Sequence, residues 1–145
     1  MTLYLDTSSL VKLYVCEAGS DSVRQAVSQA RVVATSVIAY AEMRAALARI
    51  RRHGGVKAAK LALLKREFEE QWPAYLRVEV THALCRVAGD LAEQYGLRGF
   101  DSIHLASFSD VARSAGIGET GFSSFDDRLN DAAEKLTRAL ERARQ

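Results

Sequence analysis

The alternation of short apolar segments with long amphipathic helices constrains the fold of this chain more than any other feature of its sequence. The strand signals are short and cover residues 3–5, 32–34, 76–80 and about 121–123. Apolar residues at helical spacing fill the stretches between them, and such alternation is typical of a parallel sheet covered by helices on both faces. The sequence therefore predicts an α/β fold with a short central parallel sheet.

Polar caps, glycines and a proline predict where the helices begin and end. Thr7, Ser8 and Ser9 offer hydroxyl caps for a first helix, which would leave the carboxylate of Asp6 free for other work. A helix that starts at Ser36 is expected to end at the glycine pair of residues 54–55, and the next helix to end at the Trp-Pro pair of residues 72–73. These two helices would form a protruding hairpin, and the C-terminal end of the chain, from residue 131 or 132 to residue 145, is predicted to be helical.

Composition fits one globular domain without a membrane anchor. The 145 residues are 48% hydrophobic and 26% charged, and no run approaches the roughly 18 apolar residues that a membrane span needs. Asp6 comes too early for a secretory signal peptide. We therefore expect a cytoplasmic chain that forms a single domain over residues 1–145, with Cys16 and Cys85 as reduced thiols in the core.

Four acidic residues lie far apart in the sequence at places that a parallel sheet would bring together. They are Asp6, Glu42, Asp101 and Asp126. Asp6 and Asp126 each follow an apolar run, and Asp101 opens a helical stretch, while Glu42 has small apolar neighbours at helical spacing. In open α/β sheets, such junctions meet in the crevice at the carboxyl ends of the strands. Each acid alone is more often a cap or a boundary residue, so the combination indicates the site.

The chemistry of these side chains indicates a divalent metal site. Carboxylates brought close together repel one another and either hold protons or gather cations. Mg²⁺ and Mn²⁺ prefer hard oxygen ligands and are commonly held by a few carboxylates together with the phosphate of the substrate. Because no histidine or cysteine is placed as an obvious nucleophile, metal-activated water would attack, and the expected reaction is hydrolysis of a phosphodiester.

Basic residues are concentrated in one window, although the net charge is only +2. Residues 43–66 contain no acidic residue but eight Lys and Arg side chains, among them Arg44, Arg51 and Arg52. Such a block could follow the phosphate backbone of RNA. A solvated helical hairpin without any partner would account for the same residues.

Four segments, in order, resemble a known family. They are Leu5-Asp6-Thr7-Ser8-Ser9-Leu10-Val11-Lys12, Tyr40-Ala41-Glu42, Leu97-Arg98-Gly99-Phe100-Asp101-Ser102-Ile103-His104-Leu105-Ala106 and Ser124-Phe125-Asp126-Asp127-Arg128-Leu129. In these segments the chain resembles the PIN domains of VapC-like toxins from bacterial toxin–antitoxin pairs, over about residues 1–134. The resemblance implies a three-layer α/β/α fold and a Mg²⁺- or Mn²⁺-dependent endoribonuclease. It also implies a homodimer and a small antitoxin protein that blocks the site.

The resemblance further assigns roles by position. The four acids would be the metal-site carboxylates, and the hydroxyls of Ser8 and Ser124 would steady them. Asp127 could exchange roles with Asp126, although the spacing from Ser124 favours Asp126. His104 is expected to be packed or hydrogen-bonded, because oxygen ligands already complete the metal set. The family usually ends with another strand, whereas residues 132–145 of this chain look helical.

Two other functions fit parts of the pattern. A PIN-like fold could serve as a binding or regulatory module without turnover, but a retired site would have no reason to keep four mutually repelling carboxylates. A haloacid-dehalogenase-type phosphatase or a receiver domain also places an aspartate after the first strand. That phosphatase needs a second aspartate two positions later, where this chain has Ser8.

Overall fold

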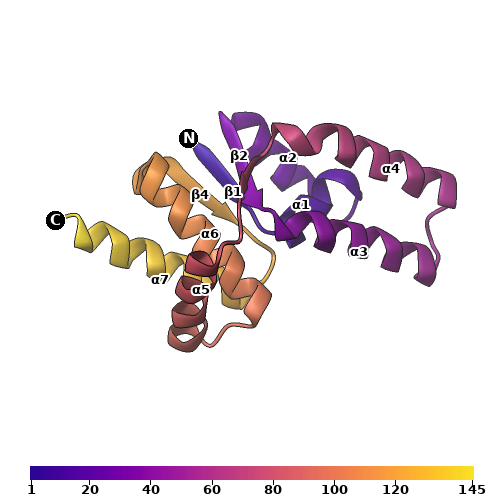
Figure 1. Ribbon diagram of the computed structural model, residues 1–145. Coiled ribbons are helices and arrows are strands. Elements are labelled where there is room, and N and C mark those ends of the chain that lie inside the picture. The colour runs from indigo at the N-terminus through magenta and orange to yellow at the C-terminus, as the bar shows by residue number, and fades with distance from the viewer.

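Four short strands form one parallel sheet at the centre of the chain (Figure 1). The computed structural model describes residues 1–145, and the strands lie in the order β3-β2-β1-β4. Their bounds are β1 Thr2–Leu5, β2 Val32–Ser36, β3 Leu76–Val78 and β4 Thr120–Ser123. Because all pairs are parallel, the carboxyl ends of the strands lie along one edge of the sheet. The predicted α/β fold is confirmed.

Seven α-helices and two short 3₁₀ turns connect and follow the strands. The helices are α1 Thr7–Tyr14, α2 Ser20–Gln29, α3 Ile38–His53, α4 Ala58–Gln71, α5 His82–Tyr95, α6 Gly99–Ala115 and α7 Asp127–Ala143, and the 3₁₀ turns are η1 Trp72–Ala74 and η2 Ile117–Glu119. None of the helices combines the length and the apolarity needed to cross a lipid bilayer.

The sheet separates two hydrophobic cores, which makes the fold three-layered. Side chains alternate between the two faces of a strand, so Leu3 and Leu5 of β1 point to one side and Tyr4 to the other. Leu3 and Leu5 pack in a core supplied by α1 to α4, whereas Tyr4 packs in a second core supplied by α5, α6 and α7. Leu3, Tyr4 and Leu5 are each at most 4% exposed. The α/β/α arrangement that the resemblance implied is therefore present.

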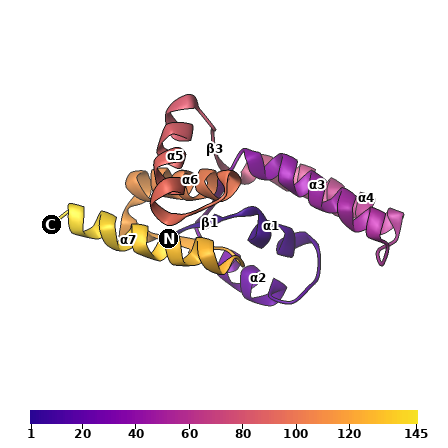
Figure 2. The same ribbon diagram turned by 90° about the horizontal axis from the view of Figure 1, so that it is seen from below.

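Helices α3 and α4 project from the sheet as a long hairpin (Figures 1 and 2). Gly54 ends α3 with a φ of 76°, a conformation that residues with a Cβ rarely adopt. At the base of the hairpin, Tyr40, Phe68 and Trp72 pack with ring centroids 5.4 to 5.7 Å apart. The predicted hairpin and its ends at Gly54 and Trp72 are confirmed, but α3 begins at Ile38 with Val37 as its N-cap, because Ser36 is the last residue of β2. The aromatic rings join the two helices at the base of the hairpin.

The C-terminal end of the chain is helical, as predicted, and adds no fifth strand beside β4. Helix α7 begins at Asp127, earlier than expected. Asp126 caps the start of this helix, because its carboxylate accepts a hydrogen bond from the amide of Leu129.

The prediction for the two cysteines is wrong in one respect. Both are free thiols, but both are exposed rather than buried in the core. Cys16 lies beyond the end of α1, and Cys85 lies on a face of α5 different from the one on which Ala88 and Leu91 enter the core. The prediction rested on residue type alone, whereas the exposure of each cysteine depends on which face of its segment is turned toward the core.

Candidate functional site

Asp6 lies where β1 ends and α1 begins, and the residue is 4% exposed. Its Oδ1 accepts hydrogen bonds from the Ser9 amide at 3.0 Å and from the Ser8 hydroxyl at 2.6 Å. Its Oδ2 accepts a hydrogen bond from the Ser124 hydroxyl at 2.6 Å. Asp6 is therefore the N-cap of α1, and the prediction that neighbouring hydroxyls would free it from capping is wrong. A carboxylate suits this position, because the N-terminal end of a helix stabilises a negative charge.

The two serines predicted to steady the carboxylates connect two strand ends that are distant in sequence. Besides contacting Asp6, the Ser8 hydroxyl accepts a hydrogen bond from the Phe125 amide at 2.9 Å. The Ser124 hydroxyl accepts a hydrogen bond from the Asp126 amide at 3.0 Å. These bonds hold the start of α7 against the start of α1. The side chain of Ser124 alone links the Asp126 amide to the Asp6 carboxylate.

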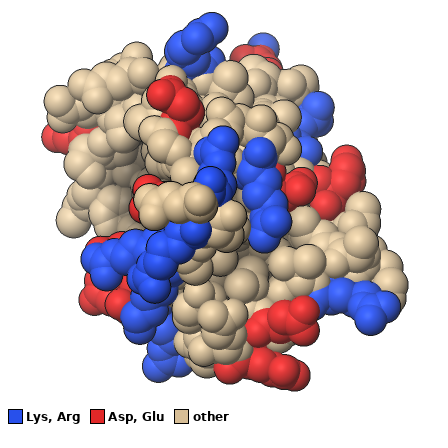
Figure 3. Space-filling model, turned by 90° about the vertical axis from the view of Figure 1, so that its left-hand side faces the viewer, with Lys and Arg blue, Asp and Glu red and all other residues tan.

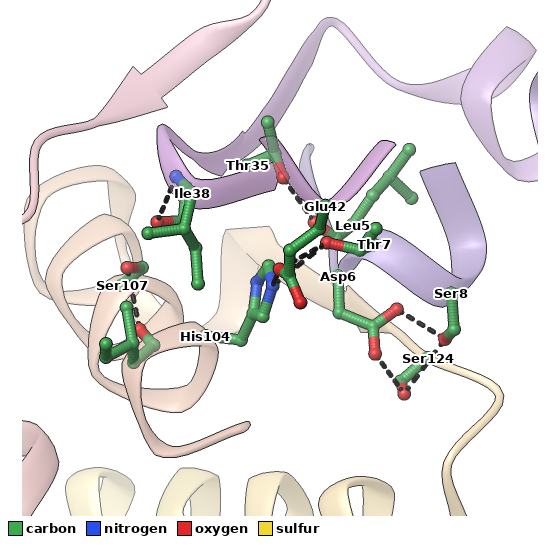
Figure 4. A network of polar contacts seen from close by, with 12 residues as sticks. Leu5, Asp6, Thr7, Ser8, Thr35, Ile38, Glu42, His104, Ser107 and Ser124 are labelled. Carbon is green, nitrogen blue, oxygen red and sulfur yellow. Dashed lines mark hydrogen bonds and ion pairs between the residues drawn. The ribbon is translucent and has the colours of Figure 1, made fainter. Parts of the chain in front are cut away.

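Glu42, on α3, is bonded to residues of two other elements (Figure 4). Its Oε1 accepts a hydrogen bond from the Thr7 hydroxyl at 2.7 Å and lies 2.8 Å from Nε2 of His104. The other ring nitrogen, Nδ1, lies 2.9 Å from the buried hydroxyl of Tyr4. With the ring proton on Nε2, the Tyr4 hydroxyl donates to His104 and His104 donates to Glu42, so one tautomer satisfies the whole chain of contacts.

The surroundings of Glu42 favour its charged form. Burial opposes ionisation, but the hydrogen bonds from His104 and Thr7 more than offset it and lower the pKa of Glu42 below 4.5. Burial raises the pKa of Tyr4 well above its usual value, which keeps its hydroxyl a neutral donor. The expectation that His104 is a packed, hydrogen-bonded residue is met, since its side chain is 3% exposed.

Asp101 and Asp126 are joined by an arginine. Asp101 lies in the first turn of α6, and its Oδ2 accepts a hydrogen bond from Nε of Arg98 at 2.9 Å. Nη2 of Arg98 lies 3.7 Å from Oδ2 of Asp126. The two carboxylates raise the pKa of Arg98, chiefly through the hydrogen bond and charge of Asp101. Asp127, the neighbour of Asp126, is exposed and forms no ion pair.

All four predicted carboxylates thus belong to one neighbourhood at the carboxyl ends of β1 and β4. Glu42 contacts Thr7, which directly follows Asp6, and Ser124 relates Asp6 to Asp126. Every carboxylate offers hard oxygen atoms only, so the donor set fits Mg²⁺ or Mn²⁺. In this conformation no three acidic, histidine or cysteine side chains converge closely enough to hold one ion.

The predicted phosphate-binding arginines lie along the hairpin. Arg44 is half-buried and pairs with Glu69 at 3.0 Å, whereas Arg51 and Arg52 are exposed in the last turn of α3. Basic side chains also gather on the side of the molecule at which the chain ends (Figure 3). Positive surface charge is therefore not confined to the hairpin, and acidic side chains are interspersed with it.

Residue spacing alone did not select three other members of this site. Thr7 and Tyr4 contact the site across 35 and 100 residues, and sequence spacing carries no signal for such contacts. Arg98 could have been found, because a basic residue three positions before an acid on a helix start is placed to pair with it. Phe100 and Phe125 immediately precede two of the acids and are the only exposed phenylalanines.

Comparisons with known proteins agree with this architecture. Residues 3–135 match the PIN domain family. Ribonuclease VapC45 of Mycobacterium tuberculosis (strain CDC 1551 / Oshkosh) and ribonuclease VapC49 of M. tuberculosis (strain ATCC 25618 / H37Rv) are each 35% identical to this chain over 133 residues. The matched region covers 90% of this chain and 88% of each relative.

Solved structures share the fold at lower sequence identity. M. tuberculosis VapC20, described as a toxin that cleaves the sarcin-ricin loop, superposes with a TM-score of 0.63 at 18% identity, over 90% of this chain and 94% of its own. PAE2754 from Pyrobaculum aerophilum superposes with a TM-score of 0.62 at 22% identity, over 100% and 91% of the two chains. The chain therefore belongs to the PIN domain family, and within it to the VapC-like proteins.

Proposed function

We propose that this chain is a Mg²⁺- or Mn²⁺-dependent endoribonuclease that hydrolyses RNA phosphodiester bonds. The observation that carries the proposal is that two hydrogen-bonded sets meet at one edge of the sheet. Thr7 holds Glu42, and the neighbouring residue Asp6 is linked through Ser124 to Asp126 and from there through Arg98 to Asp101. The VapC relatives named as ribonucleases support the same reaction and substrate.

The four carboxylates would hold the ion, and the ion, when bound, would polarise the phosphate and make water a better nucleophile. The protein contributes orientation and charge. The hydroxyls of Ser8 and Ser124 fix both oxygens of Asp6, and His104 and Thr7 keep Glu42 ionised. Because these donors are already in place, little side-chain reorganisation is needed at the Asp6 and Glu42 end of the site.

The biological setting follows from the same family relationship. We infer that the chain, as a single domain of residues 1–145, is the toxin of a cytoplasmic toxin–antitoxin pair. It would act as a homodimer and be blocked by a small antitoxin protein. Exposed arginines such as Arg51 and Arg52 would add contacts to RNA phosphates that do not depend on base sequence.

Cleavage of total RNA with and without metal tests the reaction. Activity should require Mg²⁺ or Mn²⁺, should disappear with EDTA, and should fall at least about a hundredfold in Asp6→Asn and in Asp101→Asn. Asp127→Asn is the matched control, because it removes the same charge from an exposed acid outside the network. Cleavage that persists in EDTA and in both site variants would defeat the proposal.

A catalytically silent binding or regulatory module is the second candidate. It is favoured by one observation, which is that no three possible ligands converge on a single point in this conformation. Isothermal titration with Mn²⁺ separates the two functions. Absence of binding at millimolar Mn²⁺ would favour the module, and binding that is lost in Asp6→Asn would favour the nuclease.

A further inference from the structure

Arg98 is the only lysine or arginine that contacts any of the four carboxylates. It is the N-cap residue of α6, and its side chain is 77% exposed. Its guanidinium bridges two carboxylates that come from different elements, Asp101 in α6 and Asp126 before α7. A bridge of this kind offsets the repulsion between two like charges that the fold brings together.

Arg98 contacts both carboxylates through oxygen atoms that a metal ion could use. Oδ1 of Asp126 already accepts the amide hydrogen of Leu129, so Oδ2 is the oxygen left for another partner. Arg98 approaches that Oδ2 and also Oδ2 of Asp101. A guanidinium and a divalent ion therefore compete for the same two carboxylates, and at Asp126 for the same oxygen atom.

The bridge is weak enough to be displaced. Ion pairs on exposed side chains contribute little, because water and salt screen them and two long side chains lose freedom in forming them. The guanidinium is largely in solvent and has no other hydrogen bond or ion pair that would hold it in this place. A hard cation with two formal charges binds carboxylate oxygens more strongly than such a partner.

We propose that Arg98 is a built-in counter-cation that holds Asp101 and Asp126 together in the metal-free protein and is displaced when a divalent ion binds. This positioning role rests on the proposed metal-dependent function of the same site.

The test is isothermal titration of the full chain with Mn²⁺ alone. Arg98→Gln should bind Mn²⁺ about three- to tenfold more tightly than the wild type, because the competitor is gone. Arg98→Lys, which keeps the charge but loses the planar fork, should lie between the two. Arg66→Gln is the matched control, since Arg66 is 76% exposed and pairs with Glu70 on α4 without contacting any of the four carboxylates, and the affinity of this variant for Mn²⁺ should equal that of the wild type.

The direction in which Arg98→Gln changes the Mn²⁺ affinity shows whether Arg98 competes with the metal ion or only holds the two carboxylates in place for it. If Arg98 only preorganised the two ligands, Arg98→Gln would bind Mn²⁺ more weakly, and that result or an unchanged affinity overturns the inference. The Mn²⁺ concentration for half-maximal RNA cleavage should fall by the same factor as the dissociation constant. If the wild type binds Mn²⁺ and cleaves RNA while Arg98→Gln does not bind more tightly, only this inference fails. If neither protein binds Mn²⁺, the proposed function fails with it.

Discussion

Replacement of Tyr4 by phenylalanine should destabilise the protein well beyond the loss of one surface hydroxyl. Tyr4 is 0% exposed, and its hydroxyl lies 2.9 Å from Nδ1 of His104, which is itself 2% exposed. Without the hydroxyl, Nδ1 remains buried with no partner, and an unpaired buried polar atom costs about 1–3 kcal/mol. For a chain of this size, that loss corresponds to a fall in melting temperature of roughly 3–10 °C.

Thermal unfolding followed by circular dichroism measures this effect, and Tyr95→Phe supplies the control. Tyr95 also packs against the core beside α6, but its hydroxyl makes no hydrogen bond within the protein. The same chemical change at Tyr95 should therefore alter the free energy of unfolding by no more than about 0.5 kcal/mol.

A double-mutant cycle extends the prediction to the site. Because His104 joins Tyr4 to Glu42, the effects of Tyr4→Phe and Glu42→Gln should not add, and the coupling should be about 0.5 kcal/mol or more. If Tyr4→Phe behaves like Tyr95→Phe, or if the effects of Tyr4→Phe and Glu42→Gln are additive, the hydrogen bonds from Tyr4 through His104 to Glu42 do not stabilise the fold as a unit.

Two further predictions follow from groups near the site. The pKa of Glu42 is lower in the folded chain than its value of 4.5 in the unfolded chain. The ionised side chain therefore stabilises the fold above pH 4.5, and this contribution is lost as the pH falls through the lower pKa of the folded chain. In urea titrations, Glu42→Gln should lose less stability on acidification than the wild type. Gly19 and Gly55 have φ values of 92° and 89°, but a Cβ would meet the Phe125 ring at 2.5 Å in Gly19 and open space in Gly55. In both alanine variants the left-handed backbone conformation should lower the free energy of unfolding by about 1 kcal/mol. Gly19→Ala should lose about 1 kcal/mol more, because the new Cβ pushes the Phe125 ring away from its contact with Lys12. Equal losses in the two variants would show that this ring contact is unimportant.

Local patterns in the sequence predicted most of the fold because the same local interactions shape the elements. The apolar run of β1, the glycines at the tip of the hairpin and the proline after α4 each act over a few residues, and each appears where expected. The burial of the cysteines depended on how whole segments face the core. That information lies in the packing of helices, so residue type gave the wrong result.

The site could be predicted as a set of residues but not as a set of bonds. Asp6 and Asp126 follow from the positions of strand ends, since parallel strands bring such ends to one edge of the sheet. Asp101 was indicated by a helix start, and Glu42 by its small apolar neighbours at helical spacing. The partners of these acids come from long-range contacts, such as Tyr4 with His104 and Arg98 with Asp126. Side-chain pairing of this kind is fixed only when the helices have packed, which is why spacing alone did not indicate it.

The capping role of Asp6 makes Asp6→Asn a cleaner probe of the site than its burial suggests. Asparagine caps helices about as well as aspartate, and its side-chain oxygen can accept the same hydrogen bonds from the Ser9 amide and the Ser8 hydroxyl. In the wild type the Ser124 hydroxyl donates to Oδ2 of Asp6, and in the variant the asparagine amide group can donate to that hydroxyl instead. The substitution therefore removes a negative charge while each hydrogen bond of the side chain keeps a possible counterpart. A variant that unfolds like the wild type but neither binds Mn²⁺ nor cleaves RNA would assign the loss to the missing charge and not to a disturbed fold.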